Sequence, residues 1–241
     1  MHFPNRLLLK ERIKGSEFDR DTQFQVYSLS LENYSPERAR GEKLKDSLQK
    51  IFPDSWSSFD SDYIVILLDH AATLRRKPEA FPAFTSFLEE NKLVAGQSAL
   101  FDDLFDLQKR RDETIRTLDI QREIAPRFLI PDNAPVISYE ACKILDMLRE
   151  LPPDQARSYC HSDILIMAEH DRQHQSGYLR TIFEYLNAAR SMHATADALH
   201  VHHNTVYYRV HKAKEQFGLD FSVEHRNMHY YLSCIILLYL S

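Results

Sequence analysis

The stretch ATADALHVHHNTVYYRVHKAKEQFG, residues 194–218, predicts two helices joined by a short turn, and this pair decides the fold of the second half of the chain. Apolar residues recur at helical spacing along the second helix, at Val206, Val210, Ala213 and Phe217. Because these positions share one face, they form a stripe that packs against the first helix, where the small Ala196 permits close approach. Gly218 follows the stripe, as a helix-ending glycine does. The pattern predicts a helix-turn-helix.

Polar and cationic side chains occupy the start of the second helix and its remaining faces. The residues that we expect to contact DNA are His202, His203, Asn204, Thr205, Tyr207, Tyr208, Arg209 and Lys212. Asn204 can pair bidentately with adenine, and the methyl group of Thr205 can contact the thymine methyl. Tyrosine hydroxyls, Arg209 and Lys212 suit phosphate oxygens, and the amino end of a helix attracts a phosphate. We therefore expect a recognition helix that begins near His203, with double-stranded DNA as the partner.

Structural roles are the alternative for the same residues. Asn204 is a common residue type at the N-cap of a helix, and Tyr207 and Tyr208 are large enough to be packing residues. Any one of these residues alone favours the structural role. Their combination at these spacings favours DNA binding.

The first half of the chain mixes short periods typical of strands with helical periods. Strand patterns occupy residues 21–33, 55–59, 62–69 and 92–98, and helical patterns occupy residues 35–52, 78–92 and 99–121. The resulting order is β-α-β-β-α-β followed by a helix. This order predicts an α+β domain with a ferredoxin-like split βαβ sheet.

A change of pattern divides the chain. Residues 124–139 hold three prolines and little periodicity, so we expect a linker or hinge there, after a first domain over residues 1–123. Beyond it we expect no strand. Helical patterns occupy residues 139–151, 163–171, 177–189 and 226–240, besides the pair described above. Residues 140–241 are therefore expected to form an all-α helix-turn-helix domain.

Residues 179–221 resemble the C-terminal helix-turn-helix of PucR/CdaR-type bacterial transcriptional regulators. The family pattern appears in order as Thr195-Ala196, Leu199, His202, Asn204-Thr205 and Tyr208-Arg209. Residues 161–186 also look like the family's lead-in, an Asp-containing helix followed by a Leu-x-x-Thr helix. The resemblance implies a degenerate GGDEF-like domain in the first half, which is similar to the split βαβ pattern. Many relatives carry a longer N-terminal sensory region, whereas the central domain begins almost at Met1 here.

The GGDEF-like resemblance raises the alternative of a diguanylate cyclase. That chemistry needs a glycine pair near the nucleotide and adjacent carboxylates for magnesium. The predicted hairpin reads SSFDSDY over residues 57–63 and has neither feature. Asp60 and Asp62 are better explained as turn residues. We therefore expect no enzyme activity, no catalytic residue and no cofactor.

Net charge, the spacing of cysteines and histidines, and the length of apolar runs limit the classes of function that remain. Thirty Lys and Arg against 35 Asp and Glu give a net charge of −5, so no chain-wide basic field attracts nucleic acid or membrane. The spacing of Cys142, Cys160 and Cys234 matches no zinc motif, and we expect them to be buried apolar residues in a reducing compartment. His170 and His174 have metal-ligand spacing but no third ligand nearby, so no metal site is expected. The longest apolar run, residues 230–240, covers about half a membrane span.

These observations predict a cytoplasmic, sequence-specific DNA-binding transcriptional regulator. One helix-turn-helix offers a small footprint on DNA, so we expect a homodimer, and the first domain is expected to mediate dimerisation or to receive a small-molecule effector. Two alternatives stay open. One is a ligand-sensing or protein-interaction module with a degenerate helix-turn-helix, and the other is a vestigial nucleotide cyclase.

Overall fold

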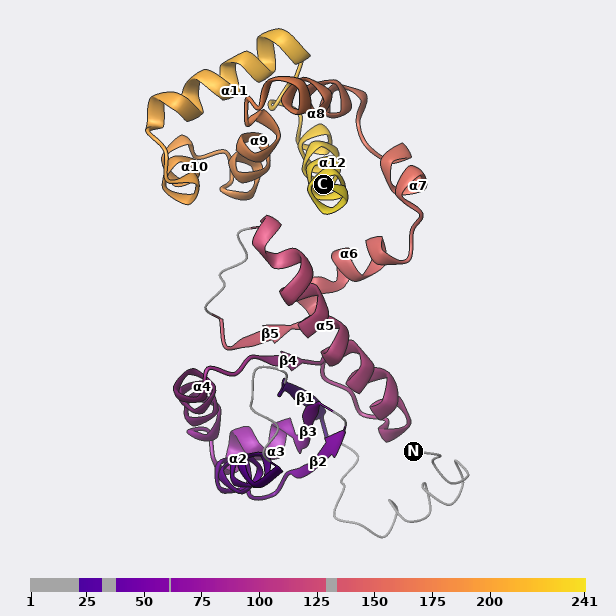
Figure 1. Cartoon of the computed structure of the whole chain (residues 1–241), viewed down its shortest axis with the longest axis vertical. Coiled ribbons are helices and arrows are strands. Elements are labelled where there is room, and N and C mark those ends of the chain that lie inside the picture. The colour runs from indigo at the N-terminus through magenta and orange to yellow at the C-terminus, as the bar shows by residue number, and fades with distance from the viewer. Residues whose placement is uncertain (1–21, 32–37, 61, 129–133) are drawn as a thin grey trace. The chain divides into compact units, whose positions relative to one another are not determined.

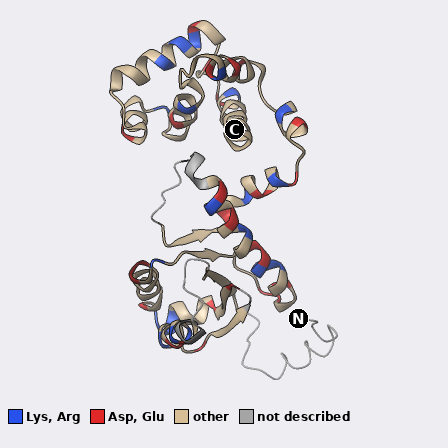
Figure 2. Ribbon diagram, viewed as in Figure 1, with Lys and Arg blue, Asp and Glu red and all other residues tan. Residues whose placement is uncertain are grey.

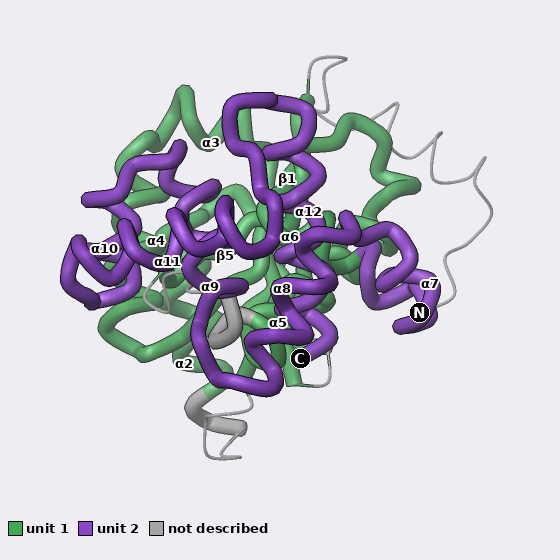
Figure 3. The backbone as a smooth tube through the Cα atoms, turned by 90° about the horizontal axis from the view of Figure 1, so that it is seen from above, with its two compact units in different colours: residues 1–146 green, residues 147–241 purple. Residues whose placement is uncertain are grey.

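The structure is a computed structural model that describes residues 22–31, 38–60, 62–128 and 134–241 (Figure 1). The chain divides into two compact units, residues 1–146 and residues 147–241, which Figure 3 shows in different colours. Each unit is described separately below. Within the described residues, no helix has the length and apolar character needed to span a membrane.

A five-stranded sheet forms the centre of the first unit. Its strands are β1 (Phe24–Ser30), β2 (Trp56–Asp60), β3 (Tyr63–Asp69), β4 (Ala95–Gln97) and β5 (Val136–Ser138). They lie in the order β2-β3-β1-β4-β5, and every neighbouring pair is antiparallel except β4 with β5. The helices α2 (Arg38–Ile51) and α4 (Ala80–Asn91) connect strands within this order. The first four strands therefore have the split βαβ topology, and the predicted α+β fold is confirmed.

Strand β1 is buried along almost its whole length because both faces of the sheet are covered. On one face, Tyr27 and Leu29 belong to a core that includes Leu48 of α2 and Phe84 of α4. On the other face, Phe24 and Val26 pack with the residues that lead into α5 (Leu107–Phe128). This double coverage explains why the polar Ser28 is also buried, with its Oγ 2.6 Å from Thr114 Oγ1 of α5.

Residues 124–139 contain regular structure where a linker was expected. Helix α5 runs through Phe128, β5 pairs in parallel with β4, and α6 begins at Tyr139. Strand β5 therefore lies inside the segment that was expected to be a linker, whereas no strand follows residue 139 among the described residues, as expected. A three-residue strand is too short to show a period of two, and its hydrogen bonds are to a partner about 40 residues away in the sequence, at Ala95–Gln97.

Two short helices were also absent from the sequence prediction. Helix α3 (His70–Arg76) follows β3 directly and starts at Asp69, whose carboxylate accepts a hydrogen bond from the Ala72 backbone N–H. Helix α7 (Pro153–Ser158) starts at the second residue of the proline pair, a position where proline is well tolerated. The predicted helix start near Ser35 and the turn residue Ser61 lie outside the described residues, as does the amino-terminal stretch before residue 22.

The described residues of the second unit contain helices and no strand, as predicted. After α6 (Tyr139–Arg149), which crosses the division between the units, come α7, α8 (Ser162–His174), α9 (Tyr178–Asn187), α10 (Met192–Leu199), α11 (His203–Phe217) and α12 (Glu224–Leu240). Fully buried side chains from four helices meet in its core: Ile164, Ile182, Val206, Val210 and Tyr230.

All three cysteines are free and buried, which confirms their predicted packing role. Burial raises the pKa of Cys142 to about 11 and also raises the pKa of Cys160 and Cys234. A thiol with a raised pKa holds little thiolate near neutral pH and is a poor nucleophile. These residues therefore contribute packing rather than chemistry.

Gly96 is a point of close approach between β4 and α5, and it yields a stability prediction. A Cβ atom at Gly96 would lie 2.2 Å from the backbone oxygen of Thr114, so either β4 or α5 must move. We expect Gly96→Ala to lower the free energy of unfolding of the first unit by about 2 kcal/mol or more. The single tryptophan, Trp56, lies in this unit, so denaturant unfolding followed by tryptophan fluorescence measures the change.

Gly41→Ala is the matched control for this prediction. A Cβ atom at Gly41, within α2, would meet only the ring of the partly exposed Phe59, at 3.0 Å. Because alanine favours a helix over glycine by up to ~1 kcal/mol, this variant is expected to be neutral or more stable. Equal stability of the two variants would contradict the close packing of β4 on α5.

Candidate DNA-binding site

The helix pair predicted from residues 194–218 is present as α10 and α11. Ser191 begins α10 by accepting a hydrogen bond from the Ala194 N–H through its Oγ. His200 ends α10 in a left-handed conformation with φ of 52°, and Val201 closes the turn by donating to the Ala196 carbonyl. Three residues, 200–202, thus separate the two helices, which is the connection that a helix-turn-helix requires (Figure 1).

The apolar stripe of α11 is buried as predicted. Val206, Val210 and Ala213 are fully inaccessible to solvent, and Phe217 is nearly so. They pack with α9 and α10, and Gly218 ends the helix with φ of 74°. Burying this stripe determines which residues of α11 remain on its outer face.

The outer face of α11 presents large polar side chains to solvent. Asn204 and His211 are exposed, and the side chains of Tyr207 and Tyr208 are 51% and 58% accessible. The rings of Tyr207 and His211 are in contact, with centroids 4.3 Å apart. The structural alternative for the two tyrosines is therefore not supported, since neither is packed into the core.

The region around this face has a small net charge. Residues 178–236 hold six Lys and Arg against five Asp and Glu, together with seven histidines. Lys212 is partly exposed, and its Nζ lies 3.7 Å from Glu215 Oε2, an exposed pair of small energetic value. Figure 2 shows basic residues along only part of α11. Hydrogen-bonding groups therefore outnumber cations at this surface.

His202, and not Asn204, is the N-cap of α11. The Nδ1 atom of His202 accepts a hydrogen bond from the Asn204 N–H at 3.2 Å. An imidazole that accepts at Nδ1 carries its proton at Nε2, so this nitrogen can donate to an oxygen outside the helix. His203, the first residue of α11, contacts the ring of His193 of α10 with centroids 5.0 Å apart. The predicted start of the recognition helix near His203 agrees with the structure.

Arg209 was predicted to contact DNA phosphates, but in the structure its side chain contacts α9. Its Nη1 donates to Thr181 Oγ1 of α9 at 3.1 Å. The guanidinium also passes over Gly177, where a Cβ atom would lie 3.1 to 3.2 Å from three of its atoms. Arg209 therefore ties α11 to the first turn of α9.

The first turn of α9 is itself held in place by α8. Asp171 of α8 accepts hydrogen bonds from the backbone N–H groups of Tyr178 and Leu179, through Oδ1 at 2.9 Å and Oδ2 at 2.6 Å. Gly177 has φ of 73°, which a glycine adopts at little cost. Sequence reasoning from charge and spacing missed Asp171, Gly177 and Thr181. The resemblance to the family's lead-in pointed to the aspartate and the threonine but not to their contacts.

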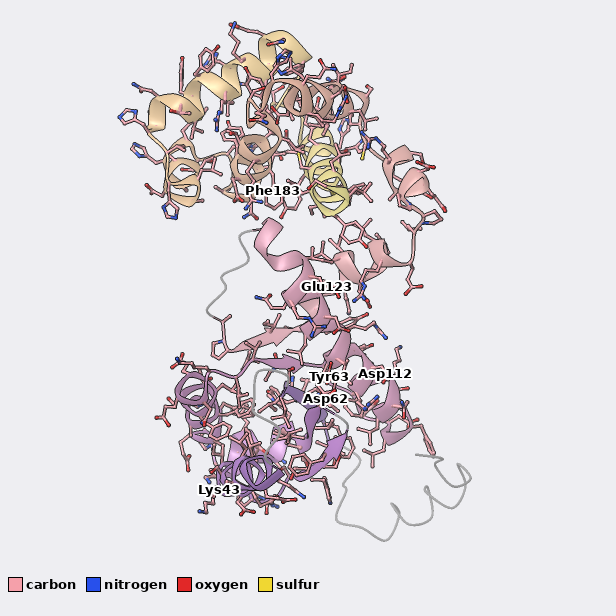
Figure 4. The ribbon with its side chains drawn as sticks, viewed as in Figure 1. Lys43, Asp62, Tyr63, Asp112, Glu123 and Phe183 are labelled. Atoms are coloured by element: carbon pink, nitrogen blue, oxygen red, sulfur yellow. The ribbon has the colours of Figure 1, made fainter. Side chains whose placement is uncertain are left out.

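The predicted hairpin is present as β2 and β3, with Asp62 in its turn. Asp62 is an exposed turn residue beside Tyr63, as Figure 4 shows. Within the described ranges of the chain, no three His, Cys, Asp or Glu side chains are grouped as metal ligands would be.

The tie between Arg209 and α9 can be tested by hydrogen exchange. Arg209→Ala removes a hydrogen bond made by a charged group, so we expect the opening free energy of the α11 amides to fall by about 1.5–3 kcal/mol. Lys212→Ala removes a cation from the same helix without a buried contact and should leave amide exchange almost unchanged. Equal protection of α11 in the wild type and in Arg209→Ala would show that Arg209 does not hold the helix.

Comparison with known proteins identifies the region that contains this site. Residues 178–236 match the family model for the PucR C-terminal helix-turn-helix domain. The purine catabolism regulatory protein of Bacillus subtilis (strain 168) is 35% identical to this chain over 80 residues, which are 33% of this chain and 15% of that protein. The chain thus matches only about one-seventh of the length of this curated relative.

A solved structure gives a weaker likeness. The regulator of polyketide synthase expression from Bifidobacterium adolescentis aligns with 98% of this chain and 87% of its own, with 16% sequence identity and a TM-score of 0.36. A score this low supports no conclusion about fold or function. The resemblance of the first unit to GGDEF-like domains stays a prediction, whereas the match over residues 178–236 confirms the resemblance of the second. The carboxyl-terminal part of this chain is therefore a helix-turn-helix domain of the PucR type.

Proposed function

We propose that this chain is a sequence-specific transcriptional regulator that reads operator DNA with the outer face of α11. The observation that carries the proposal is the exposure of Asn204, Tyr207 and Tyr208 on the second helix of a PucR-type helix-turn-helix. An exposed row of amide and phenol groups has no packing role, whereas base edges and phosphates offer partners for each of them. The Bacillus subtilis relative is named as a regulatory protein, which agrees with this assignment.

Each predicted contact residue then has a role. Asn204 and Thr205, in the first turn of α11, read base edges in the major groove. His202 donates to a phosphate through Nε2, and His203 lies at the same helix end, where phosphates bind favourably. Tyr207, Tyr208 and Lys212 contact phosphate oxygens along the flank. We assign Arg209 to positioning α11, because its Nη1 is engaged by Thr181.

The assembly that we propose is a homodimer in the cytoplasm. A recognition helix of this length covers one half-site, and paired half-sites on B-DNA lie about one helical turn apart. The first unit is the candidate for dimerisation or for receiving a signal. Its edge strand β2 exposes Trp56 and Phe59, large apolar side chains of the kind that such contacts use.

Two substitutions on α11 separate base reading from phosphate contact. A pool of randomised DNA duplexes, selected on the full-length chain, first defines the preferred site. Asn204→Ala is then expected to lose about 1–3 kcal/mol of binding free energy and to relax specificity at one base pair. Lys212→Ala is expected to weaken all sequences alike and to lower the slope of log affinity against log salt by about one.

A control variant tests whether the loss of binding is specific to the predicted contact residues of α11. Gln216→Ala changes an exposed residue near the carboxyl end of α11 and should leave both specificity and salt slope unchanged. If no sequence is enriched in the selection, or if both variants bind like the wild type, then α11 is not a recognition helix. That result would favour the alternative of a protein-interaction module.

The homodimer is tested by multi-angle light scattering on the free chain and on the selected duplex. We expect two copies on a site whose half-sites are spaced by about 34 Å. A single copy in both measurements is the result that excludes this assembly.

A further inference from the structure

Two imidazole rings meet between the two helices of the helix-turn-helix. His193 is the second residue of α10, and His203 is the first residue of α11. Their ring centroids are 5.0 Å apart, with an angle of 31° between the ring planes. His193 is exposed and His203 is partly exposed, so an ion from solvent can reach both rings. Among the described residues, neither side chain makes a hydrogen bond or an ion pair.

The contact between the two rings limits how many protons the pair holds on its own. A histidine side chain has an ordinary pKa of about 6.5, so it gains and loses a proton near neutral pH. Two adjacent imidazolium ions repel each other, which makes the second proton unfavourable while no anion is near. A phosphate offsets this repulsion, because its oxygens accept hydrogen bonds from N–H groups of both rings. A phosphate beside the pair therefore favours protonation of both rings.

Positive charge from other side chains is scarce around α10. The helix itself has no Lys or Arg, and His193 is its one side chain that can become a cation. Arg190, which precedes α10, lies 2.7 Å from Glu224 Oε1, and the guanidinium of Arg209 is engaged by Thr181 of α9. Because DNA binding depends on neutralising phosphates, a duplex that touches α10 needs the charge of its imidazole.

The carboxylates on the neighbouring helices do not oppose protonation of the pair. Asp197 is exposed one turn after His193 on α10, and a negative charge there favours an added proton. On α9, the buried Glu184 lies 3.4 Å from Arg180. Helix α8 packs against the far end of α11, where His170 contacts Phe217. The remaining titratable side chains of α11 are those of Tyr207, Tyr208, His211, Lys212, Lys214 and Glu215.

His202 differs from the pair because its own hydrogen bond opposes a second proton. Its Nδ1 accepts from the Asn204 N–H at 3.2 Å, and an accepting nitrogen carries no proton. Protonating His202 at this atom therefore removes the cap of α11, whereas protonating His193 or His203 breaks no contact of this kind. Proton uptake at the start of α11 is thus directed to the pair.

We propose that His193 and His203 together bind one phosphate of the DNA backbone and take up a proton from solvent as they do so. Each ring donates one N–H to a phosphate oxygen, which makes His193 a DNA-contact residue on α10. Because binding consumes a proton, DNA affinity rises as the pH falls through the range in which imidazoles titrate. The identity of the anion as DNA rests on the proposed function, whereas phosphate binding by the pair does not.

The first measurement is the affinity for the selected duplex from about pH 6 to about pH 8, at fixed salt. EDTA is present throughout, because neutral imidazoles also bind divalent metal ions. For uptake of one proton, we expect the wild-type affinity to fall by about fivefold over this range, and the salt slope to be steeper by about one at the acidic end. The double variant His193→Gln, His203→Gln keeps polar side chains that cannot gain a proton, so we expect it to lose most of this dependence.

His225→Gln is the matched control, because it removes an exposed imidazole from α12, outside the helix pair. This variant is expected to keep the wild-type pH profile. Parallel profiles for the wild type and the double variant overturn the proposal. An equal loss of pH dependence in His225→Gln also overturns it, because the effect then does not belong to the pair.

A measurement without DNA separates this proposal from the proposed function. Labelling with ¹⁵N-histidine gives imidazole signals from the 12 histidines of the full-length chain. At about pH 6, replacing chloride with inorganic phosphate at constant ionic strength is expected to shift the His193 and His203 signals saturably and to leave His225 in place. His193→Gln is expected to weaken the response of His203.

The two sets of data distinguish the two failures. A phosphate response of the pair, with no DNA binding at any pH, contradicts only the proposed function. DNA binding with no phosphate response, and with parallel pH profiles for the wild type and the double variant, contradicts only the phosphate site at His193 and His203.

Discussion

The burial of one apolar stripe of α11 is the constraint on which the candidate site depends. With Val206, Val210 and Ala213 fully buried, the helix can present only its remaining side chains to a partner. The apolar contacts define the rotation of α11 about its axis. The hydrogen bond from Arg209 to Thr181 adds a directional contact with α9, and apolar burial, which is non-directional, cannot supply this. Asp171 extends the same chain of contacts into α8 by capping the start of α9. The position of the outer face of α11 thus depends on how α11 packs with α8, α9 and α10.

In the first unit, the corresponding constraint is the burial of strand β1 on both faces of the sheet. Strand β1 lies between two apolar layers, so its side chains on both faces are excluded from water. Gly96 and the pair Ser28–Thr114 allow α5 to approach the sheet closely. A buried hydroxyl pair of this kind satisfies both polar groups without a cavity. Among the described residues, the edge strand β2 pairs in the sheet with β3 alone.

In the second unit, some residues of α11 face solvent and others hold the helix in place. Asn204, Tyr207 and Tyr208 are exposed, whereas Arg209, their neighbour in sequence, is engaged within the fold. His202 does both: its Nδ1 atom caps α11, and its side chain is exposed to solvent.

Local patterns by themselves determined the type of each long element, the split βαβ order, the helix pair and its buried stripe. They succeeded because helical and strand periods, a glycine at a helix end and the types of side chain on one face are all local properties. Only the tertiary structure decided the role of Arg209, the cap at His202 and the strand β5. Each of these depends on a partner distant in sequence or on a choice between equivalent local hydrogen bonds. Arg209 meets Thr181 28 residues away, and β5 meets β4 across the whole of α5. No period in the sequence reports such a pairing, since its energy exists only after the chain has folded.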